Sequence, residues 1–165
     1  MNRYFCRQLA SYSRYHCDTH NCVAHWLGIP TIFFSVLLVL ALWPVPIGSG
    51  EISVGTLLLI PAIMAWIALD VGIGCAMLTA MVPLALAAEW FGRNSSPTRV
   101  FVLGSSGFVI GWLFQIVGHV IFERRKPAFL DDLSQLFIGP MFLTAKVLVA
   151  LGRRRDLADL LSCTA

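Results

Sequence analysis

Three of the four histidines of the chain lie in one short segment, residues 15–30, which reads Y-H-C-D-T-H-N-C-V-A-H-W-L-G-I-P. The fourth, His119, lies near the end of a distant apolar segment, in G-W-L-F-Q-I-V-G-H-V-I-F-E-R-R-K-P. Imidazoles and carboxylates at the end of a membrane segment are uncommon enough to be candidates for function. We therefore interpret the two segments as halves of one metal site.

Neutral imidazoles beside a carboxylate are ligands that suit zinc, iron or copper. The sequence has no cysteine pair at C-x-x-C spacing, which argues against a structural zinc site. Three histidines and a carboxylate leave coordination positions open on iron(II), where a substrate with adjacent hydroxyl and carboxylate groups could chelate. The competing interpretation of each single histidine is a hydrogen-bonded packing residue at the membrane interface.

The composition of the chain is that of an integral membrane protein. Of its 165 residues, 58% are hydrophobic and 13% are charged, whereas a soluble domain carries about 25% charged residues. This length predicts one membrane domain over residues 1–165. No basic block is interleaved with aromatic residues, so a nucleic-acid partner is not expected.

Charge-free apolar segments and the breaks between them predict four membrane helices. The first segment is uncharged from Trp26, and its apolar part ends at the helix-breaking sequence W-P-V-P-I-G-S-G. Asp70 separates the next two segments, and E-W-F-G-R-N-S-S-P-T-R separates the third from the fourth. Each segment approaches the length that crosses a bilayer core of about 30 Å. The predicted spans are residues 26–43, 52–69, 71–88 and 100–122.

The predicted fold class is all-α, a polytopic membrane protein built as a four-helix transmembrane bundle. The fourth span carries small residues, such as Gly104 and Gly111, that allow helix backbones to approach closely. Residues 131–151 are apolar over a shorter stretch, which is interrupted by Gly139-Pro140 and Lys146. We expect a pair of interfacial or re-entrant helices there, and not a fifth span.

The positions of the basic residues set the expected orientation. If both termini lie on the same side, that side holds ten of the twelve basic residues: Arg3, Arg7, Arg14, Arg124, Arg125, Lys126, Lys146, Arg153, Arg154 and Arg155. The positive-inside rule then places both termini of this multi-pass protein in the cytoplasm, in a bacterial inner membrane or an endoplasmic reticulum membrane. The same topology brings the histidines, Asp70 and Glu123 to one membrane face.

Helix geometry limits how the histidines can meet. On a continuous helix His16 and His25 would point about 180° apart, so they can share a ligand only if the chain bends. The sequence C-D-T-H-N is suitable turn chemistry and predicts this bend near Asn21. His119 and Glu123 are spaced i, i+4 and should face the same way.

Two multi-residue motifs resemble those of a known family. The first is Y-H-x-x-x-x-N-x-x-x-H-x-x-G-I-P, which begins at Tyr15, and the second is Q-x-x-G-H-x-x-F-E-x-x-x-P-A, which begins at Gln115. Together they closely resemble the Mpo-like family of small membrane proteins, and the similarity extends over nearly the whole chain. This family includes fungal iron(II)-dependent dioxygenases of the endoplasmic reticulum membrane, which shorten 2-hydroxy fatty acids by one carbon during degradation of the sphingolipid base phytosphingosine.

The resemblance implies the same reaction here, the α-oxidation of a long-chain 2-hydroxy fatty acid by molecular oxygen with Fe²⁺ as the cofactor. The iron ligands that it implies are His16, His25 and His119. The residues that it implies at or beside the iron, as catalytic partners, are Asn21, Asp70, Gln115 and Glu123. His20 departs from the family pattern, so it is either an additional ligand or a surface residue.

A second hypothesis comes from another class, a non-catalytic membrane protein that binds lipid or carries a metal ion. A transporter should show polar residues at the bilayer midplane. The polar residues of this chain gather at one end, which favours chemistry on the head of a membrane lipid. The acyl chain of the substrate is then expected in a groove between the helices, beside the small residues of the fourth span.

Overall fold

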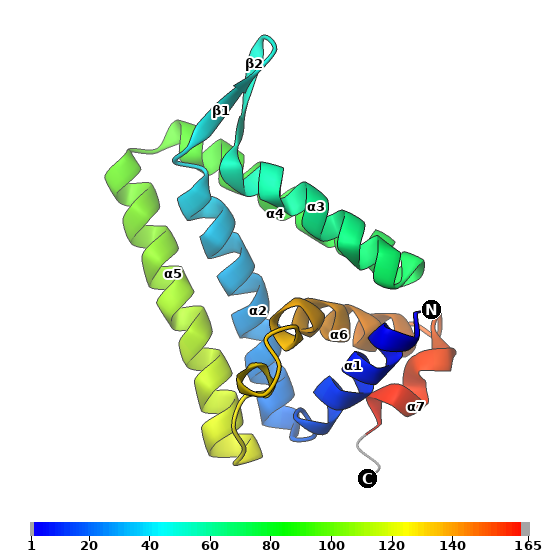
Figure 1. The fold of residues 1–165 in the computed structure, drawn as a ribbon. Helices are drawn as coiled ribbons and strands as arrows, with labels where there is room; N and C mark the ends of the chain where they lie inside the picture. The colour runs from blue at the N-terminus through cyan, green and yellow to red at the C-terminus, as the bar shows by residue number, and fades with distance from the viewer. Residues whose placement is uncertain (1, 163–165) are drawn as a thin grey trace.

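Four helices form an elongated body, and three further helices gather at one end of it (Figure 1). The structure is a computed structural model and describes residues 2–162. The helices of the body are α2, Thr19–Leu40; α3, Val54–Leu69; α4, Val71–Asn94; and α5, Pro97–Val117. The helices at the end are α1, Arg3–Arg14; α6, Gln135–Ala150; and α7, Ala158–Leu161.

Short elements connect these helices. A π-helical turn, η1, Gly118–Glu123, continues α5, and two 3-10 turns, η2, Ala128–Leu130, and η3, Arg155–Leu157, flank α6. An antiparallel hairpin of β1, Pro44–Ile47, and β2, Gly50–Ser53, projects from the far end of the body (Figure 1). The sequence predicted a helix break here but no strands. Gly48, with φ at 60°, supplies the turn that lets the two short strands pair.

Three helical segments are long and apolar enough to cross a membrane, judged by length and composition: α2, α4, and α5 together with η1. The helix α3 is apolar as well, but its 16 residues make about 24 Å of helix. A bilayer core of about 30 Å needs roughly 20 residues, so α3 is short for a complete crossing. Residues 2–162 are thus mostly helical with three candidate spans, and the predicted four-helix transmembrane bundle stays a prediction.

The start of α2 differs from the predicted start at Trp26. Asp18 caps the helix, because its Oδ1 accepts hydrogen bonds from the backbone N–H groups of His20, at 2.7 Å, and Asn21, at 3.1 Å. The chain therefore bends at residues 15–18, before the cap. The predicted bend near Asn21 is wrong by a few residues, since Asn21 already lies in the first turn of α2.

Residues 135–150 form one helix, α6, so the predicted pair of helices divided at Gly139-Pro140 is wrong. Pro140 removes only one backbone hydrogen bond from this helix. Burial of one face outweighs that cost, since Ile138, Met141 and Phe142 are all buried. The segment is therefore continuous through its proline.

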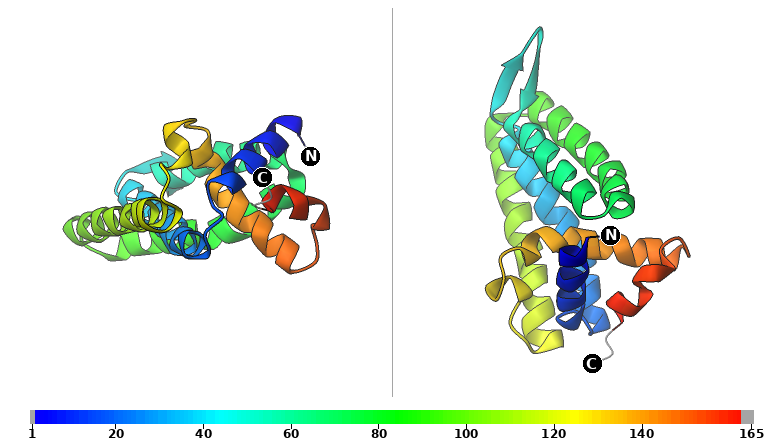
Figure 2. Two further views of the ribbon diagram at one scale, coloured as in Figure 1. Left: turned by 90° about the horizontal axis from the view of Figure 1, so that it is seen from below. Right: turned by 45° about the vertical axis from the view of Figure 1, so that its right-hand side comes forward.

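The helices α2 and α5 pack side by side along their length (Figures 1 and 2). A Cβ added to Gly104 would lie 2.5 Å from Val39 Cγ2, and one added to Gly111 would lie 2.6 Å from Ile32 Cγ1. Side chains larger than hydrogen would push the helices apart, so these glycines set the spacing of the two backbones. The helix α2 itself occupies the space beside them, where the sequence analysis expected the acyl chain.

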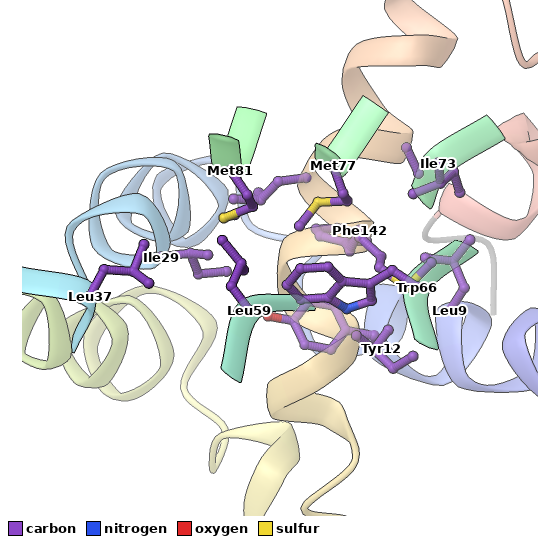
Figure 3. Close-up of a cluster of buried hydrophobic side chains, with 14 of the residues drawn as sticks. Leu9, Tyr12, Ile29, Leu37, Leu59, Trp66, Ile73, Met77, Met81 and Phe142 are labelled. Carbon is purple, nitrogen blue, oxygen red and sulfur yellow. The ribbon is translucent and has the colours of Figure 1, made fainter. Parts of the chain in front are cut away.

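A buried apolar cluster joins the body to the helices at its end (Figure 3). The helix α1 contributes Leu9 and Tyr12, α6 contributes Phe142, and α3 contributes Trp66. The indole of Trp66 also donates a hydrogen bond to the Phe137 carbonyl oxygen at 3.1 Å. The N-terminal helix is therefore part of the core, and it holds Tyr12 and the residues that follow it in place.

Replacement of Gly28 by alanine should destabilise the protein. The added Cβ would lie 2.8 Å from the Gly111 carbonyl oxygen, a backbone atom of α5 that cannot rotate away. Overpacking typically costs about 1–3 kcal/mol, which exceeds the roughly 1 kcal/mol that alanine gains over glycine within a helix. Thermal unfolding of Gly28→Ala in detergent should show a lower midpoint than the wild-type protein.

The hairpin offers a matched control for this substitution. A Cβ added to Gly50 would have its nearest neighbour 4.0 Å away, so Gly50→Ala should leave the midpoint unchanged. Equal midpoints for Gly28→Ala and Gly50→Ala would contradict the close packing of α2 against α5.

Candidate metal centre

Three buried imidazoles meet where α1, α2 and η1 come together. His16 follows α1, His25 lies early in α2 and His119 lies in η1, and they are 1%, 2% and 2% exposed. Their candidate ligand atoms all lie within 4.8 Å of one another. Histidines that are far apart in the sequence thus converge on one point, and the group could hold a metal ion.

Hydrogen bonds determine which nitrogen of His16 and His25 carries the proton. His16 Nδ1 lies 2.7 Å from the Tyr12 carbonyl oxygen, and His25 Nδ1 lies 2.9 Å from the Asn21 carbonyl oxygen. A carbonyl oxygen can only accept, so both Nδ1 atoms donate. In neutral rings both Nε2 atoms then carry lone pairs, yet these two atoms face each other at 3.0 Å. A cation bound by both nitrogens would turn this repulsive contact into an attractive one.

The surroundings of His16 favour a neutral ring. Burial, followed by the neighbouring His25, holds the pKa of His16 well below its usual value. The ring of Tyr12 stacks on His16 with centroids 3.9 Å apart and an interplanar angle of 8°, which fixes its plane. Neutral imidazole is the form that ligates metals.

His119 approaches the other two imidazoles edge-on, with centroids 4.7 Å from His16 and 4.8 Å from His25. Its Nδ1 is buried and has no hydrogen-bond partner within residues 2–162. A buried polar atom without a partner costs about 1–3 kcal/mol, which ligation of a metal would recover. His119 also lies in a π-helical turn, an irregularity that frequently marks functional sites.

Asn21 and Glu123 tie the two segments of the centre together. Glu123 accepts hydrogen bonds from the backbone N–H groups of Cys17, at 3.2 Å, and Asp18, at 2.9 Å, and from Asn21 Nδ2, at 3.1 Å. Asn21 Nδ2 also donates to the Tyr15 carbonyl oxygen at 3.1 Å. The carboxylate therefore locks η1 to the turn between α1 and α2, and it lies outside the group of candidate ligands.

Asp70 and His20 also lie outside the group of three imidazoles. Asp70 accepts a hydrogen bond from the Ile73 N–H at the start of α4 and pairs with both terminal nitrogens of Arg154, at 2.7 and 3.0 Å. Burial opposes ionisation of Asp70, but these partners outweigh it and keep its pKa below the usual value. His20 is exposed and its Nδ1 lies 3.4 Å from Asp18. The structure thus gives Asp70 an anchoring contact and His20 a surface position.

A cavity of about 230 Å³ adjoins the three imidazoles, between α2, α5 and α6. Gln115 lines it one turn before His119, and its Nε2 is buried without a hydrogen-bond partner among the described residues. Most of the wall is apolar: Ile29, Ile32, Phe33, Phe108, Trp112, Phe129 and Leu136. From His25 to Phe33 this wall follows α2 for about 12 Å. The cavity suits an amphipathic molecule whose polar head reaches the imidazoles.

Several residues of the centre were missed by the sequence analysis. Tyr12 lies in the last turn of α1 and precedes His16 by four residues, so the spacing Y-x-x-x-H was a signal that could have found it. Trp112 precedes Gln115 by three residues and lies on the same stripe of α5. Gln135 has no such signal, because it comes from a distant segment and lines the cavity only through the packing of α6.

Comparison with known proteins finds a family that matches the chain over both histidine segments. The family model described as 2-hydroxy-palmitic acid dioxygenase Mpo1-like matches residues 2–151. This chain belongs to the Mpo1-like family. The 2-hydroxy-palmitic acid dioxygenase MPO1 of Saccharomyces cerevisiae is 32% identical over 146 residues, which make up 88% of this chain and 80% of the yeast protein. No solved structure matches the chain. The family that the motifs indicated is confirmed, and the Mpo1-like match includes all four histidines.

If the three imidazoles hold a metal ion, removal of one of them should release it. His25→Ala deletes one of the two facing nitrogens, so the metal retained by detergent-purified protein should fall by tenfold or more in elemental analysis. His20→Ala is the matched control, because His20 is exposed and lies outside the group, and it should retain as much metal as the wild type. Undiminished metal in the double variant His25→Ala, His119→Ala would exclude a shared site.

Proposed function

We propose that this protein is an iron(II)-dependent dioxygenase that shortens long-chain 2-hydroxy fatty acids by one carbon. Membership of the Mpo1-like family and the activity named for the yeast relative support the reaction class. The observation that carries the proposal is the pair of imidazole Nε2 atoms that face each other at 3.0 Å beside an apolar cavity. This arrangement combines a place for a metal ion with space for an acyl chain.

The donor set fits iron(II), which His16, His25 and His119 would hold. Zinc also accepts imidazole ligands, but it has no redox chemistry, whereas a dioxygenase needs a metal that exchanges electrons. When bound, iron(II) supplies a chelation point for the carboxylate and 2-hydroxyl groups of the substrate and the electrons that activate molecular oxygen. Three neutral imidazoles leave the charge of the ion uncompensated, which favours an anionic substrate.

The residues of the chain bind and orient the reactants in this proposal. Asn21 and Glu123 keep the imidazoles in place through the turn between α1 and α2. Gln115, one turn from His119, donates a hydrogen bond to the substrate head, and the apolar walls hold the acyl chain and exclude water. Asp70 acts indirectly, because its ion pair with Arg154 anchors the chain that follows α6, and α6 forms one wall of the cavity.

We also propose that the protein crosses the membrane with both termini in the cytoplasm. The hairpin and the turn between α4 and α5 lie at one end of the body, and α1, α6 and α7 lie at the other (Figure 1). Ten of the twelve basic residues belong to the segments at this second end. The imidazoles then lie near the cytoplasmic surface of the membrane, at the depth of a fatty acid head.

Cysteine labelling tests this orientation. Gly48→Cys in the hairpin and Ser95→Cys after α4 should react with a membrane-impermeant reagent added from the non-cytoplasmic side, and Arg153→Cys should react only from the cytoplasmic side. The protein without added cysteines gives the background reaction. Labelling of all three variants from the same side would contradict the orientation.

The reaction itself is tested with purified protein, iron(II) and oxygen. 2-Hydroxypalmitic acid and one molecule of oxygen should be converted to the acid one carbon shorter, carbon dioxide and water. The shorter acid is detected by mass spectrometry, and a chelator or exclusion of oxygen should stop the conversion. Palmitic acid should react poorly, because without the 2-hydroxyl it offers the metal no second group for chelation. Iron-loaded protein that binds these acids tightly but leaves every 2-hydroxy acid unchanged would contradict the proposal and favour a lipid-binding protein.

A further inference from the structure

Gln135 of α6 brings a buried polar atom to the same cavity, and the proposed reaction assigns it no role. The side chain is 3% exposed and lines the cavity together with the imidazoles. Its Oε1 is buried and has no hydrogen-bond partner within residues 2–162. A buried acceptor without a donor costs free energy, so a molecule that enters the cavity and donates a hydrogen bond there gains affinity.

The orientation of the Gln135 amide is set from outside the cavity. Gln8 Nε2 donates to Asp132 Oδ2 at 3.0 Å, and an ionised carboxylate can only accept. Asp132 is held in turn by the Ser134 N–H, which donates to its Oδ1 at 2.9 Å. Gln8 therefore presents its own oxygen to Gln135, whose Nε2 donates to it. The atom of Gln135 that is left without a partner is thus the oxygen, a hydrogen-bond acceptor.

Gln135 belongs to the wall of the cavity that leads to His16. Gly139 follows one turn later on α6, and a Cβ added there would lie 2.9 Å from the Tyr12 hydroxyl oxygen. Tyr12 in turn stacks on His16. All four residues line the cavity, so Gln135 belongs to a continuous wall that ends at the imidazoles.

We propose that Gln135 determines specificity for the hydroxylated acid, because its Oε1 accepts a hydrogen bond from the 2-hydroxyl group of the substrate. The inference rests on the proposed function for the class of substrate. Besides His119 Nδ1, two side-chain amide atoms of residues that line the cavity have no partner within residues 2–162: the acceptor Gln135 Oε1 and the donor Gln115 Nε2. The head of a 2-hydroxy acid offers the complementary pair, a hydroxyl donor and a carboxylate acceptor.

An ionised fatty acid without the 2-hydroxyl offers only acceptors, so it leaves Gln135 Oε1 unpaired. Sites built to bind a hydroxyl group reject analogues that lack it, because a buried polar group of the protein then stays unsatisfied. Gln135 thus adds a preference for the hydroxyl group that does not depend on chelation by the metal.

Competition binding measures this preference without turnover. Iron(II)-loaded protein in detergent, kept free of oxygen, is filled with a fluorescent fatty acid, which 2-hydroxypalmitic acid or palmitic acid then displaces. Gln135→Met keeps the length and helix propensity of the side chain but removes the acceptor. Its affinity for 2-hydroxypalmitic acid should fall by about fivefold to tenfold, while its affinity for palmitic acid stays unchanged.

Two further variants separate recognition from packing. Leu136→Met changes an apolar residue of the same turn and the same cavity, so the preference for the hydroxylated acid should stay as in the wild type. Gln8→Met removes the amide that orients Gln135 but does not change the cavity wall. The preference for 2-hydroxypalmitic acid over palmitic acid should therefore fall, as it does in Gln135→Met. Gln8→Met also provides the test if Gln135→Met does not fold.

The outcomes that overturn the inference are distinct from those that overturn the proposed function. If Gln135→Met lost affinity for both acids equally, the side chain would have a role in packing alone. An unchanged preference for the hydroxylated acid would show that Gln135 Oε1 accepts no hydrogen bond from the 2-hydroxyl group. Either result overturns the role of Gln135 and leaves the dioxygenase proposal standing. A wild-type protein that binds both acids equally well would also overturn the role of Gln135, whereas the dioxygenase proposal is overturned only if 2-hydroxypalmitic acid is not converted.

Discussion

Two imidazole nitrogens that face each other across 3.0 Å constrain the rest of this structure. His16 and His25 each commit Nδ1 to a backbone carbonyl oxygen, so the lone pairs of their Nε2 atoms are directed at one another. Any other neutral tautomer would instead direct a lone pair at a carbonyl oxygen. A metal ion bound by both nitrogens would satisfy both rings at once, and His119 offers a ligand atom within 4.8 Å of theirs.

Several elements keep this contact in place. The cap at Asp18 ends the turn that carries His16, and Glu123 binds the same turn to η1. Glycine sets how closely η1 can approach, because a Cβ added to Gly118 would lie 2.4 Å from Asn21 Oδ1. The close approach of η1 to α2 therefore sets the positions of His119 and His25 relative to each other.

Two polar segments in an otherwise apolar chain indicated one shared site, and the resemblance to the family selected His16, His25 and His119 over His20. The sequence could not locate the start of α2, since the cap at Asp18 lies eight residues before the uncharged stretch that begins at Trp26. The continuity of α6 through Pro140 depends on burial, which local sequence does not show. Gln135 could not be predicted either, because only the packing of α6 brings it to the cavity.

X-ray absorption spectroscopy of the iron(II)-loaded protein tests the central claim most directly, because it counts the ligands around the metal. Three imidazole rings should surround one iron, with solvent in the positions that a 2-hydroxy acid fills, and His119→Ala should reduce the count to two. A spectrum that shows sulfur ligands, or fewer than two imidazoles in the wild-type protein, would contradict a centre built on the facing nitrogens of His16 and His25.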